Sequence, residues 1–250
     1  MRANTDRMLS MIDSAVIGSA PFLPVRLVVF PEFAHAAPVF PTVGELLEKL
    51  AIQIPNEHTE RLEQKAREHD IYIQSGSMLE VDPRWPGVVF NTTCLIGPKG
   101  ILYKYRKVNP WIPFEVHASP HDLEGYDEPL FPVADTPIGR LGCAICYDWI
   151  FPEAIRQLAA NGAEVLVRVS AYMDPWGATE PMDWWTIVNR CRALEKRFEG
   201  RRARGRVAPQ DDDLFDRGRA VGVAQHRNVV GVQEARDREH ESSATRIEHM

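Results

Sequence analysis

GRLGCAICYDWIFPE, residues 139–153, joins an apolar run holding two cysteines to an aspartate and a Phe-Pro-Glu. The run is apolar throughout, which indicates a strand buried on both faces of a sheet. Pro152 suits the first turn of a helix and Glu153 its positive end, so a helix is predicted to begin there. A buried strand leading directly into a helix is typical of α/β proteins, whose chemistry lies at the carboxyl ends of strands.

The two cysteines of this run allow three interpretations. A redox or metal-binding pair is disfavoured, because Cys143 and Cys146 lie inside a strand, where positions three apart point to opposite faces. Buried core thiols are a second interpretation, which explains Cys143 well. A nucleophile at the strand end is the third, and it explains why Cys146 is followed at once by Tyr-Asp and a helix start. Asp148 is interpreted as a structural, salt-bridged carboxylate in preference to a pocket group.

The rest of the chain alternates helical and strand patterns. Helices are predicted over 4–16, 57–69 and 181–195, and from about Pro152 to a stop at Asn161-Gly162. Strands are predicted over 25–30 and 71–79, and a buried strand within 163–172 follows that stop. A hairpin is predicted over 88–108 and a loop over 109–130. One hairpin within alternating strands and helices predicts a mixed α/β sheet with helices outside.

Composition excludes several function classes. The 250 residues can bury a sizeable core, and the net charge of −6 provides no basic field to recruit nucleic acid. Neither a run long enough to span a membrane nor a secretory signal is found in the sequence. Four cysteines are too few for a disulfide scaffold, so a cytoplasmic location is expected.

Residues 196–250 differ from the preceding 195. They are rich in arginine and have almost no periodic apolar positions, so a weakly structured tail is predicted. A second hypothesis is that this tail is read out of frame. The predicted domain therefore covers residues 1–195.

A thiol nucleophile needs a base and a cation. Glu32 directly follows the buried strand 25–30, and a carboxylate leaving a dry strand is either salt-bridged or a base with a raised pKa. Lys107 ends the second strand of the hairpin. Each residue taken singly could equally be structural.

Three segments together resemble the signatures of the nitrilase superfamily of carbon–nitrogen hydrolases: PEF at 31–33, YRKVNPW at 105–111 and ICYDWIFPE at 145–153. The resemblance implies a four-layer α-β-β-α sandwich and a Glu–Lys–Cys triad. Glu32 would be the general base, Lys107 the oxyanion stabiliser and Cys146 the nucleophile.

KVNPWIPFE, residues 107–115, is similar to the aliphatic amidase and formamidase branch, which implies that Glu115 helps to position the amide. Phe33, Trp111, Tyr147 and Tyr172 are candidate walls of the substrate pocket. The chain departs from that family at both ends, where a first strand and later core strands are expected but not found.

The resemblance therefore implies hydrolysis of a small aliphatic amide through a Cys thioester, without metal or organic cofactor. A nitrilase, an N-carbamoyl amidohydrolase and a catalytically dead remnant remain alternatives. Members of the superfamily usually associate, so a homo-oligomer is expected, with no nucleic-acid or membrane partner. Trp184 and Trp185 cannot both face one core, which favours an interface on the last helix.

Overall fold

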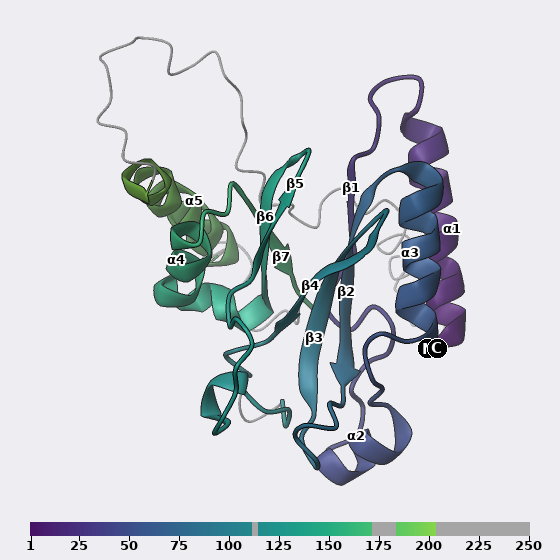
Figure 1. Ribbon diagram of the computed structural model, residues 1–250, viewed down its shortest axis with the longest axis vertical. Coiled ribbons are helices and arrows are strands. Elements are labelled where there is room, and N and C mark those ends of the chain that lie inside the picture. Colours follow the sequence, from purple (N-terminus) through teal and green to yellow (C-terminus); the bar gives the residue numbers. More distant parts are fainter. Residues whose placement is uncertain (112–114, 172–183, 204–250) are drawn as a thin grey trace, which may run out of the picture.

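The computed structural model describes residues 1–111, 115–171 and 184–203, with side chains of the last helix described from 185 to 195. The described part has four layers, in the order helices, sheet, sheet, helices (Figure 1). The α/β sandwich expected from the sequence is therefore confirmed.

The first sheet has four strands in the order β1-β2-β3-β4. Their bounds are Leu27–Val29, Tyr72–Glu80, Phe90–Gly97 and Gly100–Arg106. β1 pairs with β2 in parallel, whereas β2–β3 and β3–β4 are antiparallel. Two antiparallel steps restore the direction, so β1, β2 and β4 all end at the same edge of the sheet.

The second sheet has three strands, β5, β6 and β7, at Val133–Thr136, Gly139–Ile145 and Val165–Val169. β5 and β6 are antiparallel, and β6 and β7 are parallel, joined by the crossover helix α4. The carboxyl ends of β6 and β7 therefore lie side by side.

Helices cover the outer faces of both sheets (Figure 1). The first sheet is covered by α1 (Arg2–Ser19) and α3 (Glu57–His69), with α2 (Val43–Lys49) nearby. The second sheet is covered by α4 (Pro152–Ala160) and α5 (Trp184–Ala203). Two short 3-10 helices are also present, η1 (Pro120–Asp122) and η2 (Cys146–Ile150). Asn56 begins α3 with a reciprocal capping box, which explains why that helix starts where the sequence predicts.

The largest core cluster lies between the two sheets. Leu95 and Tyr105 from the first sheet pack with Leu141 and Ile145 from the second, and Trp149 of η2 belongs to the same cluster. A second cluster, around Ile12, Leu62 and Ile73, lies between the first sheet and its helices. Burial on both faces explains the continuous apolar runs of the central strands.

A charged network is buried beside the strand that leads to the candidate site. Arg106 is 2% exposed and donates to Glu80 at 2.8 Å and to Asp82 at 2.7 Å. Its guanidinium also lies over the ring of Phe90, 4.3 Å from the centroid. A buried guanidinium needs such partners, because leaving a charge unpaired in the interior is costly.

The predicted elements are recovered with small shifts at their ends, and two further elements are present. α2 and β5 were not predicted, and α5 continues past residue 195. No helix among the described residues combines the length and apolar character needed to cross a membrane. Residues 204–250 lie outside the described part, so the prediction for the tail stays a prediction.

Candidate active site

Three of the predicted residues follow directly on strands that end near one another. Glu32 lies three residues after β1, Lys107 immediately after β4, and Cys146 immediately after β6. Residues 170–171, just after β7, also reach this place. The first two groups come from one sheet and the others from the second, so both sheets contribute to the cluster.

The ammonium of Lys107 is fully buried and lies between two carboxylates. Its Nζ lies 2.9 Å from Glu32 Oε1, and 2.8 and 2.7 Å from the two carboxylate oxygens of Glu115. The side chain of Lys107 is 0% exposed, that of Glu32 2% and that of Glu115 10%. The structure therefore brings together Glu32, Lys107 and Glu115, as predicted from residues far apart in the sequence.

Both oxygens of Glu32 accept further hydrogen bonds. Asn91 Nδ2 donates to Oε1 at 2.8 Å, and the backbone N–H of Ala171 donates to Oε2 at 2.9 Å. These donors fix the plane of the carboxylate. Glu115 is held in a similar way, since the backbone N–H of Trp111 donates to it.

Cys146 begins η2 with a φ of 46°, in the left-handed region that non-glycine residues rarely adopt. Such a conformation costs roughly 1–2 kcal/mol and is most often found at functional sites. The cysteine lies close enough to Glu32 and Lys107 for their charges to act on it. Burial and then the charge of Glu32 raise the pKa of the Cys146 thiol to about 12, so the resting sulfur is protonated.

The other two groups also have shifted pKa values. Burial raises the pKa of Glu32, against the opposing charge of Lys107, and makes it a stronger base than an exposed carboxylate. Burial disfavours the ammonium of Lys107, but the charges of Glu32 and Glu115 and a hydrogen bond to Glu115 outweigh it and raise the pKa of Lys107. The lysine is therefore a permanent cation here.

Asp148 is a structural residue, as interpreted from the sequence, but its hydrogen-bond partners are neutral donors and not the cation of the expected salt bridge. It is 0% exposed and accepts from Tyr105 Oη at 2.7 Å, the backbone N–H of Ile145 at 3.0 Å and the backbone N–H of Asn109 at 2.7 Å. Burial raises its pKa to about 6. Asp148 thus ties the turn that carries Cys146 to the strand end that carries Lys107.

The predicted pocket walls are less well supported. Phe33 packs against the cluster of Leu46 and Leu79, and Tyr147 meets the ring of Phe151 with centroids 5.4 Å apart. These contacts are ordinary packing. Trp111 joins the site through its backbone, and Tyr172 lies outside the described residues.

Cys143 is fully buried in the core between the sheets, and it does not pair with Cys146. Burial raises its pKa well above the ordinary value. The two thiols of the motif thus occupy different environments, because β6 ends at Ile145 and Cys146 lies in the turn that follows.

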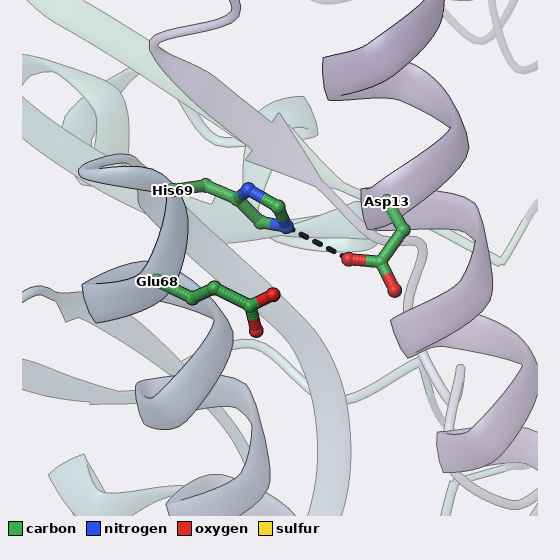
Figure 2. A group of neighbouring side chains, drawn as sticks. All are labelled: Asp13, Glu68 and His69. Carbon is green, nitrogen blue, oxygen red and sulfur yellow. Dashed lines mark hydrogen bonds and ion pairs between the residues drawn. The ribbon is translucent and has the colours of Figure 1, made fainter.

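Within the described ranges, one group of side chains has the spacing of metal ligands: Asp13, Glu68 and His69 (Figure 2). His69 Nε2 lies 2.7 Å from Asp13 Oδ1. The ammonium of Lys65 already lies 2.7 Å from Asp13 and 2.9 Å from Glu68. The group therefore has a cation of its own and links α1 to α3, away from the strand ends.

Sequence reasoning missed Asn91 and Ala171 as neighbours of the predicted triad. Asn91 is a polar side chain at the start of a buried strand, which is a usable signal. The contribution of Ala171 is a backbone N–H, for which no side-chain pattern exists.

Known proteins resemble this chain in sequence and in fold. Residues 2–198 match the family model described as carbon-nitrogen hydrolase. Formamidases of Bacillus cereus (strain Q1) and Bacillus anthracis are each 32% identical over 197 residues, which is 78% of this chain and 54% of theirs. The chain thus spans about half the length of the curated relatives it matches.

Two solved structures share the fold. Saccharomyces cerevisiae Nit3, a member of branch 10 of the nitrilase superfamily, is 24% identical with a TM-score of 0.62, covering 78% of this chain and 67% of its own. An amidase from Nesterenkonia sp. is 23% identical with a TM-score of 0.60 and the same coverage.

Proposed function

The chain belongs to the carbon-nitrogen hydrolase family, and from this premise we propose that it hydrolyses the C–N bond of a small aliphatic amide. The observation that carries the proposal is the buried ammonium of Lys107, held between Glu32 and Glu115 beside the strained Cys146. The similarity to formamidases supports an amide as the substrate.

In the first half-reaction, Glu32 takes the proton of Cys146 and the thiolate attacks the amide carbonyl carbon. The ammonium of Lys107 and the backbone N–H after Cys146 stabilise the resulting oxyanion. One such donor typically contributes about 3 kcal/mol to the transition state. The C–N bond then breaks, Glu32 returns its proton to the leaving nitrogen, and ammonia departs from a thioester.

In the second half-reaction, Glu32 removes a proton from water as the water attacks the thioester carbonyl. The C–S bond breaks, the sulfur recovers its proton from Glu32, and the carboxylic acid leaves. Glu115 accepts an N–H of the substrate amide and thereby orients the carbonyl towards Lys107.

The similarity to formamidases favours a simple amide over an N-carbamoyl amino acid. Nitriles are the competing neutral substrates, and the assay below includes them.

The test is ammonia release from formamide, acetamide, propionamide and the matching nitriles. Release from a short amide should vanish in Cys146→Ala and in Glu32→Gln, and should persist in Cys143→Ala, which removes the core thiol of the same motif. No release by a parent chain that unfolds cooperatively, or equal release by Cys146→Ala, would refute the proposal.

A further inference from the structure

The loop that carries Glu115 also buries a histidine that the proposed reaction does not use. The side chain of His117 is 3% exposed, and the backbone N–H of the next residue, Ala118, donates to the carbonyl oxygen of Val89 at 2.8 Å. The backbone is therefore fixed beside the start of β3, with the imidazole inside the protein. Burial lowers the pKa of His117 to about 4, so the ring is neutral at pH 7.

The Nε2 atom of this ring is buried and forms no hydrogen bond with any residue of the described ranges. It lies 3.7 Å from Oε2 of Glu115, which is beyond hydrogen-bond distance. Buried polar atoms are almost always paired, so an orphaned one beside a reactive cluster calls for an explanation.

The hydrogen bonds of Glu115 explain why His117 is unpaired. A carboxylate oxygen accepts about two hydrogen bonds. Oε2 of Glu115 already accepts from the ammonium of Lys107 at 2.7 Å and from the backbone N–H of Trp111. The imidazole therefore faces an oxygen whose capacity is used in the resting protein.

The ammonium of Lys107 is saturated as well. It has three protons, and three carboxylate oxygens lie within 2.9 Å of Nζ, one of Glu32 and two of Glu115. To donate to an oxyanion, the lysine must release one of these oxygens. Release of Oε2 of Glu115 costs least, because each carboxylate then keeps one contact with the ammonium. That release opens an acceptor position in front of His117.

We propose that His117 is a positioning residue, which donates its Nε2 hydrogen to Oε2 of Glu115 when Lys107 turns one proton towards the substrate oxyanion. The inference rests on the proposed function in taking Lys107 as the oxyanion donor. The new hydrogen bond replaces the contact that Lys107 gives up and keeps Glu115 in place for the amide. Polar contacts that are long in a resting site commonly tighten in this way as the reaction proceeds.

Steady-state kinetics of ammonia release test this role. His117→Phe keeps an aromatic ring and removes the donor. Its kcat should fall about 10- to 100-fold with KM unchanged, because a hydrogen bond to a charged group is lost that forms only in the transition state. His117→Gln, whose amide nitrogen reaches about as far as Nε2, should lie closer to the parent. His121→Phe is the matched control, since His121 is four residues further on with its side chain 70% exposed, and it should behave as the parent does.

Two further measurements need no turnover. NMR of protein with isotope-labelled histidine shows which ring nitrogen of His117 carries the proton, with His117→Gln assigning the signal, and we expect Nε2. Urea unfolding at pH 8 compares His117→Phe in the parent and in Lys107→Met. Because Lys107→Met removes the competing donor to Oε2, His117→Phe should lower the urea midpoint more in that background than in the parent. If Lys107→Met does not fold, the position of the ring proton and the kinetics decide.

Several results would overturn the proposal. They are a ring proton on Nδ1 in place of Nε2, a His117→Phe protein whose KM rises while its kcat is kept, and a His117→Gln protein that loses as much kcat as His117→Phe. An equal drop of the urea midpoint in both backgrounds would also overturn it, because the imidazole would then not gain a partner when Lys107 is removed.

This proposal and the proposed function fail in different ways. If the parent releases no ammonia but His117→Phe lowers the urea midpoint more in Lys107→Met, the contact between His117 and Glu115 stands and the amidase assignment falls. If the parent releases ammonia and His117→Phe matches its kcat and KM, the assignment stands and the role of His117 falls.

Discussion

Replacement of Lys107 by methionine removes the one charge that holds two buried carboxylates together. Methionine keeps the length of the side chain while losing the ammonium, so Glu32 and Glu115 face each other without their cation. A unit charge pair at the 2.9 Å separation of Lys107 and Glu32 interacts by about 6 kcal/mol at an effective dielectric of about 20. Recovered desolvation of the ammonium offsets part of this, and breaking such a buried pair typically costs about 3–5 kcal/mol. We expect the free energy of unfolding to fall by that amount at pH 8.

The loss should depend on pH, with a sign that follows from the pKa of Glu32. Burial already raises this pKa, and removing Lys107 takes away the charge that lowers it. A carboxyl whose folded pKa is raised holds its proton more tightly in the native state. Glu32 therefore lowers the free energy of unfolding as the pH rises above the pKa that this carboxyl has in the unfolded chain. At low pH, where the carboxyl is protonated in both states, the loss is smaller. Lys107→Met should be closer to the parent at pH 5 than at pH 8.

Urea unfolding at both pH values measures these differences. Lys49→Met is the matched control, because Lys49 pairs with Glu45 at 3.3 Å on the surface, where such a pair contributes about 0–1 kcal/mol. Glu32→Gln introduced together with Lys107→Met should recover part of the loss, because it removes one of the two repelling charges. A Lys107→Met protein no less stable than its Lys49→Met control, or a loss equal at pH 5 and 8, would refute the reasoning.

Other buried polar groups give predictions that unfolding experiments can check. Tyr105→Phe removes a donor to a buried carboxylate and should lower the free energy of unfolding by about 1–3 kcal/mol. The loss should exceed that of Tyr103→Phe, because the Tyr103 hydroxyl donates to a neutral amide. A loss equal to or smaller than that of Tyr103→Phe contradicts this. Because the pKa of Asp148 is raised to about 6, the parent loses stability from this group as pH rises from 4 to 6. The free energy of unfolding of Asp148→Asn should therefore rise by up to about 3 kcal/mol relative to that of the parent over this pH range. A difference between variant and parent that does not change with pH would show that the carboxyl does not titrate there. Arg106→Met should cost about 3–5 kcal/mol in urea, whereas Arg84→Met, at a half-exposed arginine, should cost under about 1 kcal/mol.

Much of the fold was predictable because buried strands and helix ends leave recognisable residue patterns in the sequence. The continuous run of β6 and the capped start of α3 are examples. α2 was missed because it has only seven residues, too few for a helical period to stand out, and β5 because its four residues alternate only once. Short elements like these are fixed by the contacts of the folded chain.

The site was predictable where a side chain follows a buried strand, as with Glu32, Lys107 and Cys146. The three side chains converge because of the way in which the two sheets dock. That docking was expected only from the family resemblance and not from any local sequence pattern. The donor from Ala171 depends on the path of the chain beyond β7, and no local pattern distinguishes this residue from an ordinary loop residue.

The division of the proposed reactive groups between two sheets has a consequence for how their alignment can be lost. Glu32 and Lys107 are attached to one layer and Cys146 to the other, and the layers are joined by packed side chains and by a few hydrogen bonds, among them those of Asp148. A small slide of one layer over the other would leave every helix and strand intact and still separate the proposed base from the sulfur. The rate at which Cys146 is alkylated is therefore a gauge of layer alignment, and it should respond to a slightly oversized core side chain well before circular dichroism does.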